Sequence, residues 1–337
     1  KTLLGLHPAA SLVIMSATMN ARIFQEYFQP LLSTPSGAAA SDGIEVPWMD
    51  VGQRPFTVKD VYLDDFGSFC LSAEAAKRAA AIGKEFAQGK LAQASGNALS
   101  KHVEKSGDLI VELAILLAEP GCTVLVFLPG LADITSLYAV AQEQAPALAG
   151  ARNLDIKVFC MHSEIPHEDM EGAFVAPGTG SAHVVFASNI AESSLTLPNV
   201  AATLDVGLHR RIQYNWKRKA FVLATTWTSM ASATQRSGRA GRTRNGTGVR
   251  LYTKDFHSTM AKFDKPDILE APIPKLYLQA KELSRQLEVL PRSAKEVLLH
   301  LPDPPELSAV EETLRDLARL GALVGASDEA ELSPIGR

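Results

Sequence analysis

The sequence predicts an α/β protein, with a mostly parallel sheet that carries helices on both faces, followed by a mainly helical module. Three observations support this fold class. Through the middle of the chain, apolar runs of strand length alternate with segments of helical periodicity. Because parallel strands are joined by crossovers that are usually helices, this alternation indicates βαβ units. After residue 269, helical stripes precede a short strand, turn and strand, which is the order of a winged helix.

The first third of the chain is expected to hold few strands. An apolar run at residues 12–15 is predicted to be a buried strand that ends in the polar loop beginning at Ser16. Residues 33–43 have the small, Gly- and Pro-containing composition of a linker. Residues 73–105 are rich in Ala, Lys and Glu but are interrupted by glycines, so we interpret the region 67–106 as a helical insertion of variable character.

The remaining elements follow in chain order. Strands are expected at 123–128, 156–161, 183–187 and 201–205, with helices at 131–144 and 167–174. A β-hairpin is predicted over 208–227 with a basic turn at 215–219. The later helices are expected to bury one stripe with Leu276, Ala280, Leu283 and Leu287, and another with Val310, Leu314 and Leu317.

Composition excludes several classes of protein. With 46% hydrophobic and 21% charged residues, the chain is not disordered, collagenous or a coiled coil. Its most apolar region, 109–132, is broken by Glu112, Glu119, Pro120 and Pro129, and so falls short of the roughly 18 apolar residues of a membrane span. Three cysteines without a C-x-x-C pair supply neither a disulfide framework nor a four-cysteine zinc site, which favours an intracellular, reducing compartment.

Charge is strongly segregated along the chain. Residues 205–254 hold 11 Lys and Arg against a single acidic residue, which leaves 22 basic and 36 acidic residues for the rest. Such a local excess predicts a site for a polyanion, either nucleic acid or nucleotide. A solvated basic surface without a ligand is the alternative.

The strongest motif reads Gln-Arg-Ser-Gly-Arg-Ala-Gly-Arg at 235–242. On a helix, positions i, i+4 and i+7 share one face, so Gln235, Arg239 and Arg242 are expected to project together. Gly238 and Gly241 would each destabilise a helix by about 1 kcal/mol, which suggests that a ligand approaches the backbone there. Paired arginines can neutralise the charge on a transferring phosphoryl group.

A second motif, Ala-Ser-Asn-Ile-Ala-Glu-Ser-Ser-Leu-Thr at 187–196, follows directly after a predicted strand. Ligands of open α/β sheets bind at the carboxyl ends of the strands, so its hydroxyl and amide groups are placed to contact phosphates. His162 and Ser163 follow another predicted strand and are expected at the same edge. The nearby His and Glu residues lack the H-E-x-x-H order, so a zinc site is not expected.

These motifs, in this order, resemble the DEAH-box RNA helicases of superfamily 2. Ser-Ala-Thr at 16–18 is similar to the family's third motif, 125–130 to its fourth, 161–166 to the sugar-phosphate-contacting motif, 187–197 to its fifth and 235–242 to its sixth. The hairpin occupies the place of the family's strand-separating hairpin, and 301–337 is similar to its winged helix. Ser188, Ser193 and Ser237 depart from the family's usual threonines and third arginine.

The resemblance implies a division of the chain into parts of known domains. Residues 1–32 would be the tail of a first RecA-like domain, 33–268 the second RecA-like domain, and 269–337 a winged-helix domain. Neither G-x-x-x-x-G-K followed by Ser or Thr, nor Asp-Glu-x-His, occurs in the sequence. The chain therefore looks as if it starts within a longer protein, and we expect it to hydrolyse no ATP by itself.

The resemblance also implies an ATP-dependent RNA helicase, with ATP and Mg²⁺ held mainly by the missing first domain. Arg239 and Arg242 would be arginine fingers, and Gln235 would help to orient the attacking water. Ser16 and Thr18 would couple hydrolysis to movement, and no metal ligand is expected in this chain. The other nucleotide contacts would be Phe174, which stacks on adenine, Asp205 at the ribose, and Gly238. The RNA contacts would be His162, Ser163, Ser188, Asn189, Ser193, Ser194, Thr196, Lys217, Arg218 and Lys219.

Two other functions stay open at this point. A helicase-derived scaffold in a large ribonucleoprotein would bind RNA without turnover, and a DNA translocase would use the same backbone-gripping motifs. Beside RNA, the expected partners are ribonucleoprotein components or an activator protein, and no membrane.

Overall fold

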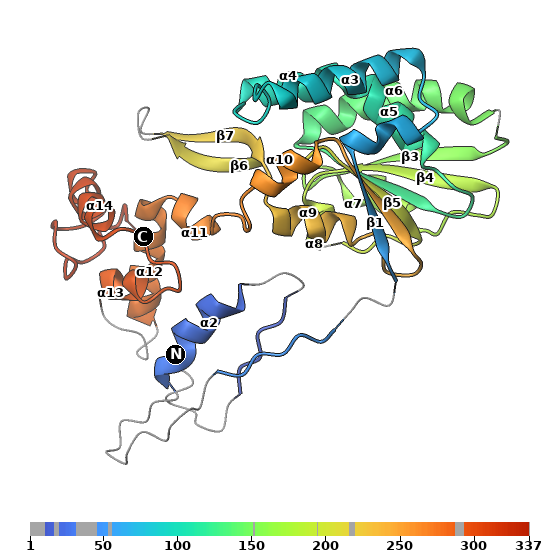
Figure 1. Cartoon of the computed structure of the whole chain (residues 1–337). Coiled ribbons are helices and arrows are strands. Elements are labelled where there is room, and N and C mark those ends of the chain that lie inside the picture. Colours follow the sequence, from blue (N-terminus) through green and yellow to red (C-terminus); the bar gives the residue numbers. More distant parts are fainter. Residues whose placement is uncertain are drawn as a thin grey trace. The chain divides into compact units, whose positions relative to one another are not determined.

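The computed structural model of the chain describes residues 11–16, 20–31, 46–52, 56–150, 152–193, 195–215, 220–286 and 293–336 (Figure 1). The chain forms two compact units. The larger unit comprises 52–211 and 223–264, and the smaller one comprises 1–51, 212–222 and 265–337. Each unit is described by itself below.

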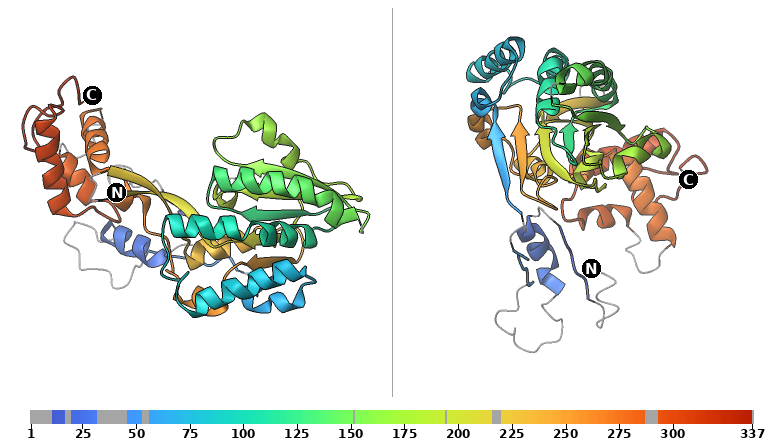
Figure 2. Two further views of the ribbon diagram at one scale, coloured as in Figure 1. Left: turned by 90° about the horizontal axis from the view of Figure 1, so that it is seen from above. Right: turned by 90° about the vertical axis from the view of Figure 1, so that its right-hand side faces the viewer.

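A six-stranded parallel sheet forms the centre of the larger unit, and Figure 2 shows it from two further sides. The strand order is β1-β8-β5-β2-β4-β3, and every neighbouring pair is parallel. The strands are β1 (Val58–Tyr62), β2 (Thr123–Phe127), β3 (Asp155–Met161), β4 (Ser181–Ala187), β5 (Val200–Asp205) and β8 (Gly246–Arg250). The predicted α/β class with a parallel sheet is confirmed.

Successive side chains of the buried strands point to opposite faces of the sheet. In β2, Val124 and Val126 join one hydrophobic cluster, whereas Leu125 and Phe127 join another. Helices α3 (Ala73–Ala87), α5 (Gly107–Leu116) and α6 (Leu131–Gly150) contribute to the first cluster. The second cluster contains residues of α7 (His167–Met170), η3 (Glu171–Phe174) and α8 (Ile190–Ser193). The sheet is therefore covered on both sides, as expected.

The region expected to be a variable insertion is part of the main core. Ile82 and Phe86 of α3, together with Leu99 of α4 (Asn97–Lys105), are buried in the first cluster. Gly83 does not interrupt α3, which runs through it to residue 87. These apolar residues pack with the helices that cover the sheet, and the variable character of the region stays a prediction.

Four predicted strands are found within one or two residues of their expected ends, but the prediction for residues 12–15 is wrong. Leu12, Val13, Ile14 and Met15 form neither helix nor strand and are exposed. An apolar run becomes a strand only where another strand pairs with it. The edge strand β1 and its neighbour β8 were not predicted, since Val-Lys-Asp-Val-Tyr and Gly-Thr-Gly-Val-Arg give weak strand signals.

A two-stranded sheet of β6 (Leu208–Asn215) and β7 (Ala220–Trp227) confirms the predicted hairpin. Six further short helices are found among the described residues, outside the C-terminal core. They are α2 (Ala21–Phe28), η1 (Gln29–Leu31), η2 (Leu63–Ser68), α9 (Met230–Ser237), α10 (Lys254–Thr259) and α11 (Asp267–Glu270).

The smaller unit has its own core in its C-terminal part, formed by α12 (Ile273–Gln286), α13 (Ala294–Leu299) and α14 (Leu307–Arg319). An antiparallel bridge joins Leu323 and Leu332, where a short strand, turn and strand were predicted. In α12, Ala280 is buried and Leu276 packs against the core as predicted, together with Tyr277 and Ser284. Leu283 is exposed, so its place in the predicted stripe is wrong, and Leu287 lies outside the described residues.

Candidate functional site

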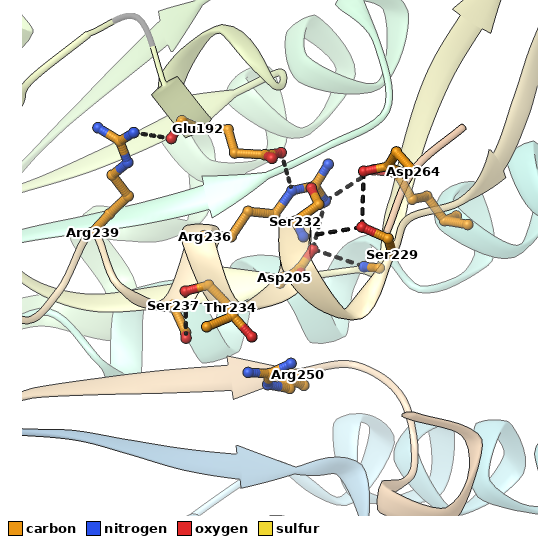
Figure 3. A network of polar contacts seen from close by, with 12 residues as sticks. Glu192, Asp205, Ser229, Ser232, Thr234, Arg236, Ser237, Arg239, Arg250 and Asp264 are labelled. Carbon is orange, nitrogen blue, oxygen red and sulfur yellow. Dashed lines mark hydrogen bonds and ion pairs between the residues drawn. The ribbon is translucent and has the colours of Figure 1, made fainter. Parts of the chain in front are cut away.

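Helix α9 carries the beginning of the strongest sequence motif. Its N-cap is Ser229, whose Oγ accepts a hydrogen bond from the backbone N–H of Ser232 (3.1 Å) and donates one to Asp264 (2.8 Å) (Figure 3). The helix ends at Ser237, with Gly238 as the C-cap. Gln235 is therefore helical, whereas Arg239 and Arg242 lie in the turn that follows.

The expected helical face of Gln235, Arg239 and Arg242 is consequently wrong, and so is the expectation of two glycines inside a helix. A glycine commonly follows the end of a helix. A Cβ atom at Gly241 would lie 2.6 Å from Cγ2 of Val58, so only glycine lets the turn pack against strand β1 without a shift. Gly241 thus lets the turn pack on the sheet, whereas Gly238 is the C-cap with ordinary right-handed dihedrals (φ −65°, ψ −8°).

The turn holds its two arginines against the segment that follows β4. Arg239 is 9% exposed, and its Nη1 donates to the carbonyl oxygen of Leu195 (3.1 Å) while its Nη2 donates to that of Glu192. Arg242 is exposed, and its Nη1 donates to Oγ1 of Thr196 (2.9 Å). The structure therefore brings the two strongest sequence motifs together, by contacts that their spacing does not show.

A small pocket lies at this junction, with a mostly apolar lining. Its residues are Leu125, Ala191, Leu195, Leu197, Val200, Arg239 and Arg242. The two guanidinium groups are the only cations in this lining. Guanidinium forks bind anionic oxygens well, so a phosphate contact at these two arginines stays a prediction.

Arg236, which sequence analysis did not single out, is the most deeply buried charge of the motif. Its Nε donates to Oε2 of Glu192 (3.0 Å), and its Nη1 donates to Oδ1 of Asp205 (2.7 Å) and to the carbonyl oxygen of Leu208 (3.1 Å) (Figure 3). The guanidinium also lies 5.1 Å from the ring centroid of Phe127. Burial alone would lower the pKa of Arg236, but the two carboxylates outweigh it and raise that pKa.

Asp205 belongs to the same buried network. Besides Arg236, its carboxylate accepts hydrogen bonds from the backbone N–H of Gly207 (2.8 Å) and from the hydroxyl of Tyr252 (3.5 Å). The side chain is 4% exposed. The ribose contact expected for Asp205 stays a prediction, and it requires this network to open.

Apart from the three residues of the hairpin turn, the residues expected to contact RNA follow the adjacent parallel strands β3 and β4, whose carboxyl ends lie side by side. The backbone N–H of Ser188 donates to the carbonyl of Met161 (3.2 Å), which joins the two strand ends. Ser188 itself is buried, and His162 is half-buried with Nδ1 accepting from the backbone N–H of Glu164 (3.2 Å). The exposed members of the set are Ser163, Asn189, Ser193 and Thr196.

Phe174, expected to stack on adenine, lies in η3 and is half-buried. Its ring already stacks on that of His167, with 5.8 Å between the centroids and 8° between the planes. Of the other expected contacts, Thr18, Ser194, Lys217, Arg218 and Lys219 lie outside the described residues. Ser16 is described and is exposed in a segment without regular structure.

Within the described ranges there is no group of three or more His, Cys, Asp or Glu side chains arranged to hold a metal ion. None of the described helices combines the length and the apolar character that a membrane span requires.

Comparisons with known proteins give a consistent result. A model of the helicase conserved C-terminal domain matches residues 105–244. The human ATP-dependent RNA helicase DHX30 is 30% identical over 326 residues, or 96% of this chain and 24% of that protein. The Xenopus laevis ATP-dependent RNA helicase dhx29 is 33% identical over 236 residues, or 68% of this chain and 16% of that protein. The chain thus spans a quarter or less of these relatives.

The same architecture occurs in a solved structure. The crystal structure of the Escherichia coli DEAH/RHA helicase HrpB aligns with 98% of this chain and 34% of its own, with a TM-score of 0.63 and 24% sequence identity. At that identity the match shows a shared fold, which extends beyond residues 105–244 to nearly the whole chain.

Proposed function

Because the chain belongs to the C-terminal region of the DEAH/RHA helicases, we propose that it supplies the second RecA-like domain and the winged helix of an ATP-dependent RNA helicase. The observation that carries the proposal is the pairing of Arg239 and Arg242 with the loop that follows β4. The proposed domains are 33–268 and 269–337, with 1–32 as the tail of the first RecA-like domain.

In this proposal the first RecA-like domain holds most of the ATP and Mg²⁺, and this chain completes the site. Phosphoryl transfer needs positioning and charge stabilisation more than covalent help from the protein. Arg242 is exposed and can reach a phosphate directly, whereas Arg239 must first exchange the carbonyls of Glu192 and Leu195 for phosphate oxygens. That exchange is favourable because charged acceptors form stronger hydrogen bonds with guanidinium than neutral carbonyls do.

RNA would pass along the carboxyl ends of β3 and β4. The exposed hydroxyl and amide groups there suit phosphate and sugar contacts, which position a strand without reading its sequence. Glu192, Leu195 and Thr196 of this loop also accept hydrogen bonds from Arg239 and Arg242. RNA binding to the loop and phosphate binding to the arginines are therefore expected to affect each other. The protein partners, whether ribonucleoprotein components or an activator protein, and an intracellular reducing compartment belong to the same proposal.

Arg239 provides the test. Arginine fingers contribute about 10³ to 10⁵ in rate, so Arg239→Ala in the full-length protein is expected to lower RNA-stimulated ATP hydrolysis by at least about 10³. Arg239→Lys is expected to rescue little, because an ammonium group cannot reproduce the fork that spans two oxygens. RNA affinity without nucleotide is expected to change little, since the side chain is buried behind the loop.

Arg244 is a matched control in the same basic turn. Its side chain is half-exposed and contacts Sγ of Cys122 (2.8 Å) and the carboxylate of Glu119 (3.4 Å), away from the loop after β4. Arg244→Ala is expected to keep ATP hydrolysis within a few-fold of wild type. Near-normal hydrolysis by Arg239→Ala, combined with a collapse of RNA binding, would assign Arg239 to the RNA path and refute the finger.

A further inference from the structure

Arg236 contacts three segments to which the proposed function gives different tasks. It lies in α9, three residues before Arg239 in the sequence. Its side chain binds Glu192 in the loop after β4, Asp205 at the end of β5, and the carbonyl of Leu208 at the start of the hairpin strand β6. One guanidinium group thus joins the loop proposed for RNA, the central sheet and the base of the hairpin.

The burial of Arg236 excludes direct contact with substrate. Its side chain has no exposed surface, whereas Arg242 in the following turn is exposed. A buried ion pair is at best a modest source of stability, because desolvation of both charges offsets most of their attraction. A buried arginine whose hydrogen bonds reach three separate segments is suited to fixing their relative positions.

Glu192 is the residue that Arg236 and Arg239 share. Its carboxylate accepts from Nε of Arg236, and its main-chain carbonyl accepts from Nη2 of Arg239 (Figure 3). When Arg239 leaves that carbonyl for a phosphate, the tie between Glu192 and Arg236 persists. The loop then stays attached to α9 and follows it, together with Leu208 at the base of the hairpin.

We propose that Arg236 is a positioning residue that couples nucleotide engagement by Arg239 to the loop 188–197 and to the hairpin base. The tasks given to Arg239, the loop and the hairpin rest on the proposed function, whereas the contacts of Arg236 are observed in this chain. It predicts that weakening the hydrogen bonds of Arg236 reduces the stimulation of ATP hydrolysis by RNA, while the surfaces that bind nucleotide and RNA both remain. A purely stabilising ion pair would predict a loss of folded protein and nothing more.

The experiment compares Arg236→Lys and Glu192→Gln with Arg250→Lys in the full-length protein. Lysine keeps the positive charge but cannot bind two carboxylates and a carbonyl at once, and glutamine keeps an acceptor without the charge. Arg250 is the control for burial, since it is also buried and paired with a carboxylate, Oδ2 of Asp60 at 3.0 Å, but on β8 and β1. It is linked to Asp205 through the hydroxyl of Tyr252, which lies 3.2 Å from Arg250 and 3.5 Å from Asp205. Thermal unfolding midpoints measure the structural effect of each variant.

Two readouts follow from the proposal. In Arg236→Lys and Glu192→Gln, the stimulation of ATP hydrolysis by single-stranded RNA is expected to fall about 10-fold, a size typical of coupling between sites. Hydrogen exchange of backbone amides in 189–193 is expected to rise in both variants, and exchange in 208–212 is expected to rise in Arg236→Lys, which alone weakens the contact with Leu208. In Arg250→Lys, exchange in both segments is expected to stay at the wild-type level. The double variant is expected to be no worse than the more affected single variant, because both remove the same tie.

The outcomes separate this proposal from the proposed function. Unchanged hydrogen exchange in Arg236→Lys, or the same loss of RNA stimulation in Arg250→Lys at an equal loss of thermal stability, would overturn the positioning role. If the wild-type full-length protein shows no RNA-stimulated ATP hydrolysis, the proposed function fails, and the exchange data still decide whether Arg236 ties the loop and the hairpin base together.

Discussion

The stability of the larger unit should depend strongly on one carboxylate, that of Asp205. Its Oδ1 lies 2.7 Å from Nη1 of Arg236, and the two side chains are 4% and 0% exposed. Asp205→Ala leaves Arg236 with Glu192 and one carbonyl, and removing one partner of a buried ion pair costs about 3–5 kcal/mol. Asp205→Asn keeps an oxygen that can accept from Arg236 and from Gly207, so its expected cost is about 1–3 kcal/mol.

Asp60 offers a matched control, because it forms a comparable ion pair with Arg250 (3.0 Å) but is 37% exposed. Water can replace its carboxylate in Asp60→Ala, so the loss is expected to be clearly smaller. Guanidinium chloride unfolding of the 337-residue chain, followed by far-UV circular dichroism, measures the three variants against wild type. Equal midpoints for Asp205→Ala and Asp60→Ala would refute the reasoning that burial of the network sets the size of the effect.

Two further predictions concern the same domain. Gly207→Ala is expected to destabilise it by about 2–4 kcal/mol in the same unfolding assay, because Gly207 has φ +77° and a Cβ atom would lie 2.7 Å from the ring of Tyr252; a loss under about 1 kcal/mol would contradict this. Burial, reinforced by Arg78 and Lys105, lowers the pKa of His102 to about 4. In the unfolded chain this imidazole binds a proton near pH 6.5, whereas in the folded protein it stays neutral down to about pH 4. The free energy of unfolding therefore falls as the pH drops from 6.5 towards 4, by up to about 3 kcal/mol. Wild type should therefore lose more stability between pH 7 and pH 4.5 than His102→Leu, and equal losses would argue against a buried neutral histidine.

The parts of the fold that could be predicted are those whose local pattern and tertiary environment agree. Strands β2 and β4 each contain an apolar run, 124–127 and 184–187, that is buried on both faces, as is typical of a strand in the middle of a parallel sheet. Strand β8 contains two glycines and follows a turn, so its strand character comes from pairing with β1 and β5 rather than from its own residues. Residues 12–15 show the reverse, since they are apolar but pair with no strand among the described residues.

The sequence singled out the two motifs that meet in the structure, but it did not predict how they meet. The spacing of Gln235, Arg239 and Arg242 suggests a helical face, but Gly238 ends the helix, and the two arginines meet through the loop after β4. Arg236 carries no distinguishing signal in the sequence, because a buried arginine and an exposed one look alike within a basic motif. Its partners Glu192, Asp205 and Leu208 are 28 to 44 residues away in the sequence, so only the fold brings them together.

The arginines of this motif differ in their surroundings because helix α9 ends between Arg236 and Arg239. Arg236 lies on the last helical turn, where its side chain points into the larger unit and finds two carboxylates, so it is fixed. Arg239 and Arg242 lie beyond Gly238, where the backbone has left the helix and both guanidinium groups face a loop. An arginine can exchange carbonyl and hydroxyl partners for a phosphate at little cost in free energy. If Arg236 left the carboxylates of Asp205 and Glu192, buried charges would remain unpaired, which is costly. The same residue type thus serves as an anchor before the glycine and as an exchangeable contact after it.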